Sequence, residues 1–107
     1  MKKAKRDRLT KAGWQVGSAK EFLGLSDAES AVIEIRVTLA RALRQQRLQR
    51  RLSQAAVAAE LGSSQSRVAK MEAADPSVSV DLLLRSLFVL GSTPAQVGRA
   101  IATAHAA

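Results

Sequence analysis

The stretch that decides the fold is SQAAVAAELGSSQSRVAKMEA, residues 53–73. It predicts two helices of about eight residues each, 54–61 and 65–73, and each follows a serine that can cap the first free amides. Only Gly-Ser-Ser at 62–64 joins them, and so short a connection containing glycine brings two helices together steeply. The stretch therefore predicts a helix-turn-helix.

At four positions in this helix pair, the residue type has a steric explanation. Ala58 has to be small because the second helix crosses the first there, and Gly62 allows the positive φ that the turn needs. Val68 and Met71 are expected to point inward and hold the pair against the core. The opposite side of the second helix is then formed by Gln65, Ser66, Ala69 and Lys70.

A long helix is predicted before this pair. The sequence Ser-Asp-Ala-Glu at 26–29 is a capping box, in which the first and last side chains satisfy free backbone amides at a helix start. The helix that it opens runs from 27 to about 50. Its core-facing stripe follows a helical spacing and consists of Val32, Ile35, Leu39 and Leu43.

Three more helices are predicted by similar signals. A serine precedes one over about 80–90, and Thr-Pro-Ala-Gln at 93–96 is a capping box for a last one over 94–103. Ser-Ala-Lys-Glu at 18–21 opens a short extra helix that Gly24 would close. The predicted fold class is all-α, a five-helix domain with a short extra N-terminal helix.

Length and composition exclude several classes of protein. With 107 residues the chain suits one small domain at 26–107, preceded by a disordered basic arm at 1–13 and an extension at 14–25. It has no cysteine and one histidine, which excludes disulfides, thiolate metal sites and imidazole clusters. No nucleophile–base pair, carboxylate pair or membrane-length apolar run is visible. We therefore expect no enzyme activity, no catalytic residue, no metal, no cofactor and no membrane contact.

The positive charge of the chain is concentrated in two places. The chain has 17 Lys and Arg against 9 Asp and Glu, which gives a net charge of +8. One cluster is the arm at 1–13, and the other is an arginine series between residues 36 and 51. A polyanion is the natural partner for such clusters, although a charge run can also be only a solvated face.

Residues 52–91 resemble the Xre-type family of Cro and lambda-repressor helix-turn-helix proteins. The resemblance is carried by the Leu-Ser-Gln opening, the Gln-Ser-Arg-Val segment, the Met-Glu that follows it and the Leu-rich helix ending in Leu-Gly. It implies a lambda-repressor-like fold that binds a double-stranded DNA operator, in the bacterial cytoplasm at the nucleoid. One departure is Arg50-Arg51, because relatives usually carry a glycine near there to end the first helix.

The resemblance also implies which side chains contact DNA. Gln65, Ser66 and Lys70 would enter the major groove, where glutamine can pair with adenine and lysine with guanine, and Ala69 would contact a thymine methyl. Each of them could instead be an ordinary exposed helix residue. The side chains expected on phosphates are Gln54, Arg67, Arg44, Arg47 and Arg51.

The extension WxVGxAxEFLGL, residues 14–25, looks similar to that of HigA-class antitoxins, which bind a toxin and repress their own operon. Trp14, Phe22 and Leu23 would then anchor the toxin, whereas the alternative is that Trp14 and Phe22 cap the domain's own core. A pseudo-palindromic operator requires two copies, so a homodimer is expected. The protein is accordingly expected to be a repressor, either the antitoxin of a toxin–antitoxin operon or a stand-alone or prophage-type repressor without a toxin partner.

Overall fold

A computed structural model describes residue 24 and residues 26–104 of the chain. These residues form five α-helices and no strand, which confirms the predicted all-α class. The chain divides into two units, residues 1–32 and residues 33–107. The basic arm, the short extra helix and the partner candidates Trp14, Phe22 and Leu23 lie outside the described residues. No helix in the described part is long and apolar enough to cross a membrane.

The first unit contributes the start of helix α3 (Asp27–Gln49). Ser26 Oγ accepts a hydrogen bond from the backbone N–H of Glu29 at 3.0 Å, which is one half of the predicted capping box. Val32, expected in the core-facing stripe, is 46% exposed, because the described residues of this unit include no second helix that could cover it. The buried part of the stripe therefore begins at Ile35, in the second unit.

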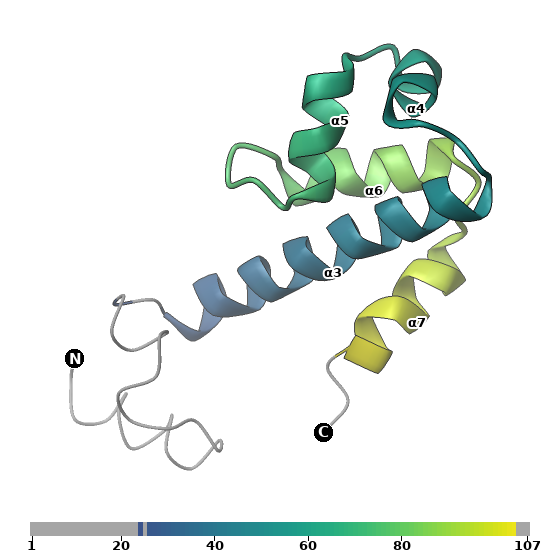
Figure 1. Cartoon of the computed structure of the whole chain (residues 1–107). Helices are drawn as coiled ribbons and strands as arrows, with labels where there is room; N and C mark the ends of the chain where they lie inside the picture. Colours follow the sequence, from purple (N-terminus) through teal and green to yellow (C-terminus); the bar gives the residue numbers. More distant parts are fainter. Residues whose placement is uncertain (1–23, 25, 105–107) are drawn as a thin grey trace, which may run out of the picture. The chain divides into compact units, whose positions relative to one another are not determined.

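The second unit carries the rest of α3 followed by α4 (Gln54–Leu61), α5 (Gln65–Glu72), α6 (Val80–Val89) and α7 (Pro94–Ala104). All of these helices begin at the predicted residue and end within one residue of the prediction. Helix α4 packs against α5 and α6. Figure 1 shows α4 and α5 on one side of α3 and α7 on the other.

The core of this unit is aliphatic, as the composition predicts. Phe88, the aromatic residue of the described part, is 42% exposed and contributes little to the core. Burial of the aliphatic side chains supplies the main driving force for packing the helices together. The largest fully buried side chains are Leu39, Leu43, Met71, Leu83, Leu87, Val57 and Val68.

Serine and threonine caps start the later helices. The Oγ atoms of Ser53 and Ser64 each accept the backbone N–H three residues further on, at 3.0 and 3.2 Å. Thr93 and Gln96 form a reciprocal capping box, with backbone-to-side-chain bonds of 2.9 and 3.2 Å. These bonds satisfy amides that have no partner inside their helix, and they explain why the starts are readable from the sequence.

Four helices end in the same way, with a residue just beyond the helix in the left-handed region. Gly62 (φ 63°) and Gly91 (φ 102°) follow α4 and α6, whereas Arg51 (φ 56°) and Ala74 (φ 55°) follow α3 and α5. At each end two backbone hydrogen bonds, spanning three and five residues, close the turn. Arg51 therefore makes the turn expected of a glycine, although its Cβ makes that conformation cost about 1–2 kcal/mol.

Candidate nucleic-acid interface

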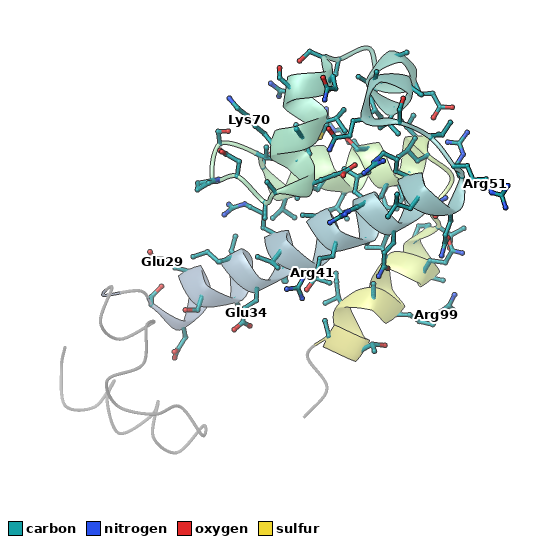
Figure 2. All side chains as sticks on the ribbon, viewed as in Figure 1. Glu29, Glu34, Arg41, Arg51, Lys70 and Arg99 are labelled. Carbon is teal, nitrogen blue, oxygen red and sulfur yellow. The ribbon has the colours of Figure 1, made fainter. Side chains whose placement is uncertain are left out.

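Helix α5 turns apolar side chains inward and polar side chains outward. Val68 and Met71 are fully buried. The predicted base-reading residues Gln65, Ser66 and Lys70 are exposed, whereas Ala69 is half-buried. Figure 2 shows Lys70 pointing away from the other helices. The helix thus presents a polar edge to solvent while its apolar edge anchors it to the core.

The turn between α4 and α5 fixes the angle at which this edge is presented. Ala58 is 4% exposed within the helix pair, and its carbonyl oxygen accepts the backbone N–H of Ser63 at 2.8 Å. Gly62 has φ 63°, and a Cβ placed there would meet no atom within 4 Å. Glycine is therefore favoured at position 62 by its backbone conformation alone.

Gln54 and Gln65 are hydrogen-bonded across the two helices. Gln65 Nε2 donates to Gln54 Oε1 at 3.2 Å, and Gln54 Nε2 donates to Glu72 Oε1 at 3.3 Å. Gln54 is the first residue of α4, and Gln65 is the first residue of α5. The bond therefore fixes two side chains at two helix N-termini relative to each other.

The Arg47–Glu72 ion pair, which is largely buried, anchors these hydrogen bonds at Glu72. Arg47 Nε donates to Glu72 Oε2 at 2.6 Å and Arg47 Nη2 donates to Oε1 at 2.9 Å, and the two side chains are 13% and 5% exposed. Arg47 Nη1 also donates to the Leu52 carbonyl oxygen at 3.1 Å. Hydrogen bonding to the carboxylate raises the pKa of Arg47, so the guanidinium stays charged. The sequence predicts Arg47 on a phosphate, whereas its guanidinium is engaged inside the protein.

A second arginine of the predicted series is also paired. Arg50 Nη1 and Nη2 donate to Glu60 Oε2 and Oε1 at 2.8 and 2.9 Å. These side chains are 37% and 38% exposed, and the hydrogen bonds raise the pKa of Arg50. The arginine series between 36 and 51 is consequently not one free cationic face.

A hollow of about 270 Å³ lies beside Gln54. Arg44 of α3 and Ala69 of α5 line it together with Gln54. Within the described residues Arg44 is exposed and has no acidic partner. Arg47, paired with Glu72, also lines the hollow, so the structure brings four of the predicted DNA-contacting residues together at one edge of α5.

A second hollow, of about 400 Å³, lies along an adjacent edge of α5. Arg67 and Lys70 line it with the hydroxyl-bearing side chains of Ser64, Ser66 and Ser77. Cations and hydroxyl groups are the usual donors to phosphate oxygens. Ser77 was not predicted from the sequence, because it belongs to the loop after α5 and only the fold brings it beside Lys70.

The loop that carries Ser77 is held by Asp75. Asp75 Oδ1 accepts the backbone N–H of Ser77 at 2.9 Å and its Oγ–H at 2.6 Å. These bonds, with a smaller contribution from the charge of Lys70, lower the pKa of Asp75 below the ordinary carboxyl range. The sequence Asp-Pro-Ser at 75–77 is typical of such a turn, and it was the available signal for this part of the surface.

Arg51 lies apart from these residues. It is exposed in the turn after α3 and lines neither hollow. Figure 2 shows Arg51 and Lys70 at opposite ends of the helix pair. The structure leaves Arg51 outside the group around α5, which holds the other predicted phosphate-contacting residues Gln54, Arg44, Arg67 and Arg47.

Comparison with known families agrees with this geometry. A family model described as a helix-turn-helix domain matches residues 38–100. The matched range contains α4, α5, the turn between them and every residue that lines the two hollows. No curated protein and no solved structure matches the chain.

Proposed function

Because the chain belongs to the helix-turn-helix domain family, we propose that it is a sequence-specific regulator of transcription that reads double-stranded DNA with α5 in the major groove. The observation that carries the proposal is the hydrogen bond between half-buried Gln54 and exposed Gln65, which lies beside Arg44 and is anchored on Glu72. In such a pair, one side chain is oriented to contact a base edge, and the other lies close to a phosphate of the same DNA strand. The activity requires no cofactor and no catalytic residue.

Gln65 is oriented for an adenine. One Nε2 hydrogen is donated to Gln54, which leaves the second hydrogen and the Oε1 acceptor for a base edge. Adenine offers the N7 acceptor and the N6 donor in the major groove, so Gln65 can donate to N7 and accept from N6. Ser66 and Lys70 follow along the same edge, with lysine suited to guanine O6 and N7 and Ala69 to a thymine methyl.

The two hollows suit the phosphates on either side of the bases. Arg44 and Gln54 border one hollow, and Arg67 borders the other with Ser77. Each free cation that neutralises a phosphate releases condensed counterions, so binding weakens as salt rises. The proposed phosphate contacts do not include Arg47, because its guanidinium donates two hydrogen bonds to the Glu72 carboxylate.

We further propose that the protein acts as a homodimeric repressor of the Xre type. Two copies can read two half-sites about one helical turn apart, which a domain with a single reading helix cannot do alone. The exposed apolar side chains Phe88 and Val89, 42% and 59% exposed at the end of α6, support a contact between copies. A dimer blocking a promoter would repress transcription in the bacterial cytoplasm, at the nucleoid.

An antitoxin role is the narrower form of this proposal. It is supported by the sequence of the extension at 14–25, in which Trp14, Phe22 and Leu23 are the predicted toxin anchors. Co-expression with the product of the neighbouring reading frame separates the two forms. A stable complex lost in Trp14→Ala supports the antitoxin, whereas promoter binding without a partner supports a stand-alone or prophage-type repressor.

The proposed DNA reading is tested by selecting duplexes from a random library with the full-length protein. We expect enrichment of a two-fold symmetric site with half-sites about ten base pairs apart, bound by two copies. Footprinting of the enriched site should protect both strands. Retention of all duplexes without enrichment would contradict sequence-specific reading and leave only non-specific affinity for polyanions.

A further inference from the structure

A groove between α3 and α7 lies outside the proposed DNA interface. It has a volume of about 610 Å³, and no residue of α4 or α5 lines it. Figure 1 shows α7 on the side of α3 opposite α5. A ligand in this groove would therefore leave α5 free to contact DNA.

Two complete helix faces form the walls of the groove. The α3 wall comprises residues 38, 41, 42, 45, 46 and 49, and the α7 wall repeats this spacing of three and four between 96 and 104. Residues at this spacing lie on one side of a helix. From Thr38 to Gln49 the α3 wall extends about 16 Å, or three turns. A trench with these walls has the length and form to receive one further short helix.

The groove is lined by apolar side chains, by glutamine and hydroxyl-bearing side chains, and by two arginines. Ala42, Val97 and Ala100 provide small and aliphatic surface. Arg41 from α3 and Arg99 from α7, both labelled in Figure 2, are exposed. Neither forms an ion pair among residues 26–104, and no Asp or Glu lines the groove. An occupant that complements this surface has to bring apolar side chains flanked by carboxylates.

We propose that this groove docks an acidic amphipathic helix of a partner protein. Its apolar side would pack on Ala42, Val97 and Ala100, and its carboxylates would pair with Arg41 and Arg99. A second copy of this chain does not fit, because a two-fold contact through the groove would gather four guanidiniums without a carboxylate. DNA fits poorly, since each wall has a single cation and part of the lining is apolar.

The proposal is tested with a synthetic helical peptide of about 14 residues. Its apolar side carries Leu and Ala, and its flanks carry Glu; a matched peptide carries Lys in place of Glu. Titration into the ¹⁵N-labelled full-length protein is expected to shift resonances of residues 38–49 and 96–104 with the Glu peptide only. The double variant Arg41→Gln/Arg99→Gln should bind it roughly tenfold more weakly. Arg85→Gln, an exposed arginine outside the groove, should bind it as the natural protein does.

Charge reversal makes the test decisive. Arg41→Glu with Arg99→Glu is expected to exchange the preference, so that the Lys peptide binds better. Equal affinity of the natural protein for both peptides, or shifts confined to residues that do not line the groove, would overturn the proposal. So would displacement of the Glu peptide from the groove by a random DNA duplex, which would identify a nucleic acid as the occupant. Arg41→Gln/Arg99→Gln should retain operator binding, so failure of the groove proposal is distinguishable from failure of the proposed DNA reading.

Discussion

The guanidinium of Arg47 and the carboxylate of Glu72 form a two-pronged ion pair between the last turns of α3 and α5, with contacts of 2.6 and 2.9 Å. The pair joins the long helix to the end of the reading helix. Because Glu72 also accepts from Gln54, which in turn accepts from Gln65, the same pair supports the half-buried Gln54 and the exposed Gln65. Stability and the proposed DNA reading would therefore depend on one shared set of contacts.

Arg47→Ala is expected to lower the free energy of unfolding by about 2–3 kcal/mol. It leaves the Glu72 carboxylate, 5% exposed, with only the weak amide donor of Gln54. Glu72→Gln should cost less, because it removes the buried charge that needs a partner. Urea unfolding followed by circular dichroism measures both variants.

Arg50→Ala is the matched control for this prediction. Arg50 makes the same two-pronged contact with Glu60, but the two side chains are 37% and 38% exposed. Exposed pairs are screened by water and salt, so this variant should unfold close to the natural midpoint. Equal losses in Arg47→Ala and Arg50→Ala would show that burial of the first pair contributes nothing.

Arg51→Gly and Ala74→Gly are each expected to raise the free energy of unfolding by about 1 kcal/mol. Both residues have positive φ values, 56° and 55°, which glycine adopts without a Cβ penalty. Gly62→Ala should lower stability by a similar amount through backbone strain alone, since its Cβ would meet no atom within 4 Å. Destabilisation by Arg51→Gly would contradict the left-handed turn after α3.

Ala58→Leu is expected to destabilise the domain by about 1–3 kcal/mol. The residue is 4% exposed where α4 packs on α5, so added methylene groups would push the helices apart. Ala59→Leu, on the exposed side of the same helix, is the control for changed helix propensity. An unchanged thermal midpoint for Ala58→Leu would refute close packing at this crossing.

The loop after α5 is expected to lose stability in acid. The pKa of Asp75 is lowered in the folded protein by its bonds to Ser77, so its contribution is fully present above the ordinary carboxyl pKa of about 4. That contribution is lost as the pH falls through the lowered folded value. The stability difference between the natural protein and Asp75→Asn should therefore shrink below pH of about 4. A difference that stays constant down to the acid limit would contradict this assignment.

The elements that sequence reasoning predicted well are those set by neighbouring residues. Each capping serine acts on an amide three residues away, so Ser53 and Ser64 mark the starts of α4 and α5 without knowledge of the fold. The glycine turn at 62 and the inward side chains Val68 and Met71 are equally local. For this reason the helix pair and its polar edge could be predicted together.

Contacts between distant residues could not be predicted in the same way. Arg47 in the last turn of α3 and Arg50 just beyond that helix are three positions apart, and nothing local distinguishes the one that pairs with Glu72 from the one that pairs with Glu60. Tertiary packing determines the partner, and it places the Arg47 guanidinium on Glu72, although the sequence predicts Arg47 on a phosphate. Ser77 is the opposite case. The sequence does not predict it in the interface, but the fold brings it into the hollow that Lys70 lines.

The most direct test of the central claim compares Gln65→Ala with Arg44→Ala on the selected operator and on random DNA at several salt concentrations. Gln65→Ala should lose about 1–3 kcal/mol on the operator and almost nothing on random DNA. Arg44→Ala should weaken both by similar amounts and reduce the salt slope by about 0.9. Gln49→Ala, a matched glutamine in the groove between α3 and α7, should change neither affinity. Equal losses of Gln65→Ala on both DNAs would contradict base reading by α5.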